Sequence, residues 1–359
     1  MTKTITSPVK KIDFINMTKG FAIILVVLGH CVKAEGLSAN IIFSFHMPLF
    51  FIIGGYLFNY QKYEHDYKIF VKNKAKRLLI PYFFCCFLFF LHWLTFECPN
   101  PVINTPLTHI FNLFMKTTAG ILYGIGNVNV FPPLKDVFSI GPLWFLVTYF
   151  LGINLLYFFI KYFEKKNIYI RIIALLLLTY SGAYIGKFIF LPWGLDIALV
   201  CLSFLYAGYV IKKHNIISYI CDKNFAIILF ILFLGYLFAF NNSRISLNDR
   251  DYHHLLIAVA GAIITSTIIM CLFKIWADNE NKTIGLKNAL SYLGIESIII
   301  LCFHGRLQYL LPNTSWLKYS PIIESVYLIL YCLAIGVVLN KIPYINKIFS
   351  SNKYKQSGI

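Results

Sequence analysis

The chain alternates long apolar segments with short polar connections over most of its length. Ten segments approach the roughly 20 residues that an α-helix needs to cross a bilayer. They lie near residues 14–33, 41–60, 78–97, 140–160, 172–190, 194–211, 224–240, 254–273, 289–311 and 321–340. The pattern predicts an all-α polytopic membrane protein with about ten transmembrane helices. It forms one membrane-embedded domain over 1–359, ending in a basic tail at 341–359.

Basic residues gather in alternate connections and thereby predict an orientation. With the amino terminus in the cytoplasm, 23 of the 32 Lys and Arg fall on that side and 8 on the other. Cytoplasmic loops are enriched in Lys and Arg, so this split predicts that both termini are cytoplasmic. The same rule explains the net charge of +17 without nucleic acid, for which the sequence carries no fold signature.

Composition supports this class. Charged residues make up 13% of the chain, against roughly 25% in soluble domains, and the mean hydropathy is +0.70. The first apolar segment and the following Val32–Ala34 resemble a signal peptide, but nine further segments follow, so a retained first helix is expected. The nine cysteines lie mostly in apolar segments without metal-ligand spacing, which is typical of small buried side chains.

Two ionisable side chains, Lys19 and His30, lie in the first apolar segment. Eleven residues make just over three turns of an α-helix, so both side chains share one face, about 16 Å apart along the axis. An ionisable group inside a membrane is costly and favours a functional role. For Lys19 the alternative is a side chain that extends to the lipid headgroups.

A second histidine, His46 in "FSFHMPLFF", returns to a depth similar to that of His30. An imidazole titrates near neutral pH, so His30 is a candidate general base and His46 its candidate partner in catalysis. The alternative for each is a ring that is hydrogen-bonded to a backbone carbonyl. No metal is expected, because the histidines lie on different segments without ligand spacing.

Four further residues are weaker candidates for substrate contact. Trp144 in "GPLWFL" is alternatively an anchor at the membrane interface. Asp196 follows "LPWG", where a carboxylate more often satisfies the amides of a helix start. His304 and Arg306, in "LCFHGRL", are expected near the same side of the membrane as His30.

Two connections are expected on the outer side. The segment 98–139 is rich in Pro and Gly, and it either covers a site or forms a re-entrant or interfacial hairpin. The segment 241–254 is a candidate for contact with a sugar or an anionic headgroup, or else a solvated polar turn. Its charged side chains are Arg244, Asp249, Arg250 and Asp251.

Five stretches, in this order, resemble the bacterial integral-membrane acyltransferase family 3, and in particular its fucose 4-O-acetylase-type sugar O-acetyltransferases. They are "DFINMTKGFAIILVVLGH", "FSFHMPLFFIIGGYLF", "GPLWFL", "LPWGLDIAL" and "GIESIIILCFHG". The resemblance spans essentially the whole chain. The signature of this family, a basic residue and a histidine separated by ten residues, falls on Lys19 and His30.

The chain departs from the family pattern at three points. Lys19 stands where many members have arginine, and lysine lacks the bidentate fork of a guanidinium. The stretch "LWFLVTYF" has no glutamate where many relatives carry one. Glu296 stands where close relatives tend to have asparagine.

The resemblance implies transfer of an acyl group, usually acetyl, from cytoplasmic acyl-CoA to a hydroxyl of a surface glycan or its polyprenyl-linked precursor. It implies acetyl-CoA as donor, Lys19 as a ligand of the CoA phosphates, His30 as the base, and a bacterial inner (plasma) membrane location. One alternative is a transporter or flippase of lipid-linked glycans, although the sequence shows no internal repeat. Another is a non-catalytic membrane partner.

Overall fold

The computed structural model describes residues 13–32, 36–96, 107–124, 126, 139–222, 245–279, 283–311 and 316–349. These residues form helices, and no strand is found among them. The α-helices are α1 (Phe14–Cys31), α2 (Leu37–Tyr56), α3 (Tyr67–Phe96), α4 (Leu107–Tyr123), α5 (Trp144–Phe163), α6 (Ile168–Ile185), α7 (Leu195–Lys213), α8 (Ile216–Asp222), α10 (Leu255–Asp278), α11 (Ile284–Ile295), α12 (Ser297–Leu310), α13 (Pro321–Lys341) and α14 (Asn346–Phe349). Short 3-10 turns are η1 (Gln61–Tyr63), η4 (Gly141–Leu143), η5 (Pro192–Gly194) and η6 (Trp316–Tyr319).

Length and composition make eight of the described helices candidate membrane spans, which confirms a multi-pass membrane protein. The predicted segment 289–311 is not one straight helix. It corresponds to α11 and α12, which are bent by 74° relative to each other at a break between them. The break lies at Glu296, which ends α11 and precedes α12. The predicted span 224–240 lies outside the described residues, and the orientation of the termini stays a prediction.

Helix α3 extends well beyond the apolar segment that predicted it. The segment begins near residue 78, whereas the helix begins at Tyr67. Hydropathy marks where a helix becomes apolar and not where its hydrogen bonding begins. Lys74 and Arg77, expected in a loop, are therefore helical and lie three residues apart on one face.

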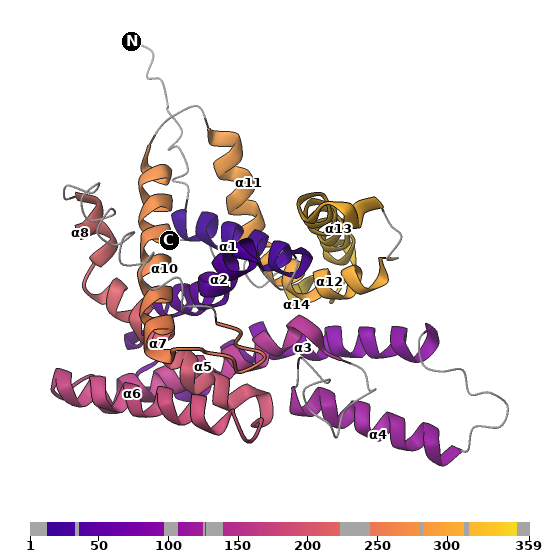
Figure 1. Cartoon of the computed structure of the whole chain (residues 1–359), viewed down its shortest axis with the longest axis horizontal. Coiled ribbons are helices and arrows are strands. Elements are labelled where there is room, and N and C mark those ends of the chain that lie inside the picture. Colours follow the sequence, from indigo (N-terminus) through magenta and orange to yellow (C-terminus); the bar gives the residue numbers. More distant parts are fainter. Residues whose placement is uncertain are drawn as a thin grey trace, which may run out of the picture.

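Helix α1 occupies the middle of the bundle with α2 (Figure 1) and packs against α2, α10, α11, α12 and α13. Its approach to α11 is close because two glycines meet there. A Cβ at Gly20 would overlap the Leu290 carbonyl, and one at Gly294 would overlap the Asn16 carbonyl. Small residues let membrane helices approach in this way. The contact fixes the rotation of α1 and so the direction of the adjacent Lys19.

Helix α4 belongs to the connection 98–139 and runs beside α3 at one side of the molecule (Figure 1). The Phe90 and Phe114 ring centroids are 5.7 Å apart, and the Tyr82 hydroxyl donates to the Ile121 carbonyl at 2.6 Å. On the same helix, Phe111 is 61% exposed. The exposed apolar side chains of α4 suit the interfacial alternative, and most of 98–139 outside α4 lies beyond the described residues.

Candidate active site

His30 precedes the last residue of α1 and lines a cavity of about 350 Å³ that we call the histidine pocket. His30 is exposed to this space, whereas most of α1 is buried or half-buried. The walls come from α1, α2, η4 with the start of α5, α12 and the segment 245–249. The lining residues are Val26, His30, Phe43, His46, Met47, Gly126, Gly141, Pro142, Trp144, Ile245, Ser246, Leu247, Asn248, Asp249 and Leu301. His30 and His46 thus line the same pocket, as a similar depth of the two residues requires.

Two buried histidines, His46 and His304, adjoin His30. The His30 and His304 ring centroids are 5.1 Å apart, and His46 lines the pocket directly. The Nδ1 atom of His46 lies 2.7 Å from the Ile42 carbonyl, and that of His304 lies 2.8 Å from the Ile300 carbonyl. A carbonyl can only accept, so we assign the proton of each neutral ring to Nδ1 and leave Nε2 with a lone pair. His46 is therefore hydrogen-bonded to a backbone carbonyl and also lines the pocket.

The end of α1 is held by Gln308 of α12. Its Nε2 atom donates to the His30 carbonyl at 2.8 Å and to Glu324 Oε1 at 3.2 Å. The last carbonyls of a helix lack intrahelical partners, so this side-chain amide satisfies one of them. The buried Glu324 of α13 in turn holds the amide. Gln308 and Glu324 together fix the backbone of His30. The sequence did not predict the contact of Gln308 with either residue.

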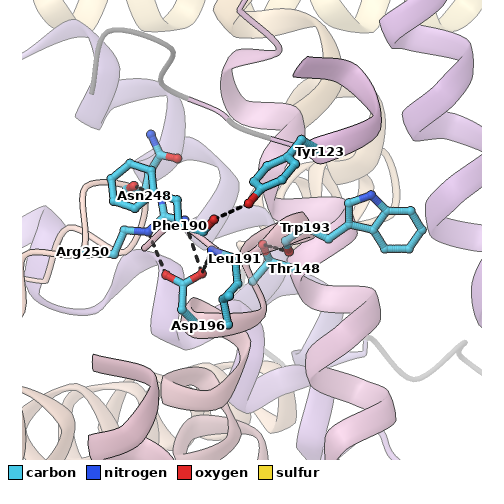
Figure 2. A network of polar contacts seen from close by, with 8 residues as sticks. All are labelled: Tyr123, Thr148, Phe190, Leu191, Trp193, Asp196, Asn248 and Arg250. Carbon is cyan, nitrogen blue, oxygen red and sulfur yellow. Dashed lines mark hydrogen bonds and ion pairs between the residues drawn. The ribbon is translucent and has the colours of Figure 1, made fainter. Parts of the chain in front are cut away.

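The segment 245–249 forms one wall of the histidine pocket, and an ion pair of the next residue, Arg250, anchors it. Arg250 Nε lies 2.8 Å from Asp196 Oδ2, with side chains only 6% and 0% exposed (Figure 2). Arg250 also donates to the Asn248 carbonyl at 2.7 Å and lies over the Phe190 ring at 3.9 Å. Asp196 lies in the first turn of α7, but its carboxylate accepts from the amide of Leu191, which precedes η5, at 3.2 Å. Asp196 thus anchors the segment through Arg250 and does not itself line the histidine pocket.

Replacing Asp196 with alanine is expected to lower the free energy of unfolding by about 3–5 kcal/mol, because Arg250 would remain buried without its counter-charge. Thermal unfolding in detergent micelles measures this. Asp251→Asn is the control, since the Asp251 side chain on the same segment is 52% exposed and should tolerate the change. Equal melting temperatures of the Asp196→Ala variant and the wild type would contradict the anchoring role.

The remaining candidates fall at different places. Trp144 is only 8% exposed and lines the histidine pocket, so its interpretation as a lipid-interface anchor is wrong. Arg306 points elsewhere, because its Nη2 atom lies 2.9 Å from His92 Nδ1 on α3. The structure thus brings Trp144 and His304 to His30 and places Arg306 in a contact between α12 and α3.

A second cavity, which we call the lysine pocket, measures about 200 Å³. Lys19 of α1 lines it together with Lys74 and Arg77 of α3. Ser297, the first residue of α12, also lines it, so the positive end of a helix dipole opens into the same space. Three cations and a helix amino terminus in one cavity favour an anionic ligand. The three-residue spacing of Lys74 and Arg77 predicts that the two side chains share a helix face, but only once the helix is known to begin at Tyr67.

The two pockets meet at Met47 and Leu301, which line both of them. Met47 is 9% exposed and Leu301 5% exposed, so each fills the space between the cavities. We call this pair the partition. Lys19 and His30 stand on its two sides, about 16 Å apart along α1. In the part of the chain that the structure describes, no group of three or more His, Cys, Asp or Glu is placed to hold a metal ion.

Comparisons with known proteins extend this description. A family model described as "Acyltransferase domain" matches residues 12–341. The Nodulation protein NolL of Mesorhizobium japonicum (strain LMG 29417 / CECT 9101 / MAFF 303099) is 22% identical over 278 residues, which cover 73% of this chain and 67% of that protein. No solved structure matches the chain. The range matched by the family model contains both pockets and the partition.

Proposed function

The chain belongs to acyltransferase family 3, and from this premise we propose that it is an O-acyltransferase, in the first instance an O-acetyltransferase. It would carry the acyl group from acyl-CoA to a hydroxyl of a surface glycan or of a polyprenyl-linked precursor. The observation that supports this most is the junction of a cationic cavity and a histidine cavity at Met47 and Leu301. A multi-pass chain with a cationic cavity suits a bacterial inner membrane and a donor from the cytoplasm.

On the donor side, Lys19, Lys74 and Arg77 are suited to the phosphates of CoA. A guanidinium can bind a phosphate in bidentate fashion, whereas each lysine acts as a point charge. Arg77 thus offers on α3 the fork that Lys19 lacks. Apolar side chains, among them Ile23 and Phe50, line the rest of this cavity and match the pantetheine arm.

On the acceptor side, the histidine pocket combines polar and aromatic groups that suit a sugar. Asn248 and Asp249 offer amide and carboxylate groups to sugar hydroxyls, and Trp144 offers an aromatic face to the C–H groups of a sugar ring. This proposal gives the segment 245–249 the sugar-contact role that the sequence left open.

The chemical step assigns the proton transfers to His30. Its imidazole takes the proton of the sugar hydroxyl while the oxygen attacks the carbonyl carbon of the thioester. The C–S bond of the tetrahedral intermediate then breaks, and the imidazolium returns the proton to the leaving thiolate. Holding both substrates in line removes much of the entropic barrier. His46 has its proton on Nδ1, so its Nε2 would accept from a different hydroxyl of the sugar rather than donate to the oxyanion.

Two measurements test this function. Purified protein in lipid nanodiscs should bind acetyl-CoA and hydrolyse it slowly when no acceptor is present, in contrast to empty nanodiscs. Glycan mass spectrometry of cells with and without the gene should show a gain of one acetyl mass. The proposal is wrong if acetyl-CoA is neither bound nor consumed and no acyl mass appears. Movement of a lipid-linked glycan across liposomes without acyl transfer would instead support the flippase alternative.

A further inference from the structure

We propose that a groove beside the lysine pocket, at the ends of α2, α5 and α7, binds the nucleotide end of the acyl-CoA donor. The proposal rests on the function proposed above. The groove has a volume of about 690 Å³. Its lining includes three tyrosines, Tyr56, Tyr60 and Tyr209, and four lysines, Lys161, Lys165, Lys212 and Lys213, and we call it the tyrosine groove.

Size and continuity point to this place. At about 200 Å³, the lysine pocket is smaller than the roughly 300–1,000 Å³ of typical ligand pockets, so it does not by itself suit a whole CoA. The tyrosine groove has more than three times the volume of the lysine pocket, and Leu57 lines both cavities. Leu57 follows the last residue of α2 and is 57% exposed. A ligand that leaves the lysine pocket past Leu57 therefore enters the groove.

The length of the donor agrees with this route. Met47 at the partition and Leu57 at the groove are ten residues apart on α2, which corresponds to about 15 Å along the axis. The chain of a pantetheine arm has about twelve atoms, equivalent to about four peptide units or ~14 Å when extended. A thioester at the partition would thus place its diphosphate near Leu57 and its nucleotide beyond it.

The lining matches the chemistry of a nucleotide. A purine base stacks on aromatic side chains, and Tyr56, Tyr60 and Tyr209 present such rings. Lys213 is engaged in an ion pair with Glu164, so Lys161, Lys165 and Lys212 are the cations offered to phosphates. The Lys212 Nζ lies 5.1 Å from the centre of the Tyr56 ring, which sets a cation beside a stacking surface. Lysines are common on cytoplasmic loops, but that rule does not require them to surround an aromatic groove.

A truncated donor tests the proposal. S-acetylpantetheine carries the reactive thioester but lacks the nucleotide, so it should be insensitive to the groove. In nanodiscs, the Tyr60→Ala and Lys212→Gln variants of the full chain are expected to raise the KM for acetyl-CoA about ten-fold. Their kcat/KM for S-acetylpantetheine should equal that of the wild type. Adenosine 3′,5′-bisphosphate should inhibit the wild type competitively and these variants about ten-fold more weakly.

Matched controls separate the outcomes. Lys166→Gln removes a neighbouring exposed lysine that does not line the groove and should leave both donors unaffected. Tyr60→Phe keeps the stacking face and should retain the wild-type KM. Equal losses with both donors, or no loss with either, would overturn the groove assignment while wild-type transfer stands. If the wild type transfers acetyl from neither donor, the proposed function itself fails, and the groove assignment fails with it.

Discussion

Replacing His30 with alanine is expected to lower kcat for acyl transfer by about 10²–10⁴-fold, the usual contribution of a positioned general base. Without the imidazole, the sugar hydroxyl would have to lose its proton to water. The affinity for acetyl-CoA should not change, because the lysine pocket lies beyond Met47 and Leu301. Initial rates and equilibrium binding, measured on the same nanodisc preparation, separate the two effects.

Two further variants make the His30 experiment decisive. His65→Ala removes an exposed histidine outside both pockets and should keep the wild-type rate. His30→Gln fills much of the same space but cannot accept the proton in the same way, so it should be nearly as slow as the alanine variant. Wild-type kcat in the alanine variant would exclude His30 as the base.

The sequence predicted what depends on local periodicity. The spacing of Lys19 and His30 needs only a helix without a break, and α1 supplies one from Phe14 to Cys31. The return of His46 beside His30 needs only a short connection between antiparallel helices. Both follow from the alternation of apolar and polar segments, and both hold in the structure.

Contacts between distant segments could not be read from the same pattern. Asp196 was expected at a helix start, but its partner Arg250 lies 54 residues further along the chain. Arg306 was a candidate for substrate contact on the same side of the membrane as His30, but its contact with His92 joins residues 214 positions apart. Such pairs depend on the order in which helices pack, which hydropathy does not encode.

The sequence also did not predict where helices begin and end outside their apolar segments. The basic residues before residue 78 look like a loop because they are polar, yet α3 continues through them from Tyr67. Lys74 and Arg77 therefore joined Lys19 only in the structure. The bend at Glu296 has a similar cause, since the apolar pattern runs through it without interruption. The bend brings the first residue of α12 to the lysine pocket.

Replacing Leu301 with tryptophan is expected to lower acyl transfer by on the order of 100-fold, because a larger side chain at the partition would keep thioester and hydroxyl out of line. Binding of acetyl-CoA through Lys19, Lys74 and Arg77 should persist. Leu301→Met, which nearly conserves volume, is the control for packing and should remain active. Met47→Phe places a larger side chain at the same partition from α2. It should reproduce the effect if the variant at Leu301 folds poorly.

The opposite change gives the partition a second, independent test. Leu301→Ala leaves space in a buried wall and should admit acyl groups longer than acetyl, so the ratio of butyryl to acetyl transfer should rise. A role limited to packing predicts lower stability with an unchanged ratio. Under the proposed function, Leu301 stands where the two pockets meet, so its size is expected to act on the passage of the acyl group and not on binding of the nucleotide in the tyrosine groove. A wild-type butyryl-to-acetyl ratio in Leu301→Ala, with wild-type rates in Leu301→Trp and Met47→Phe, would contradict transfer across this boundary.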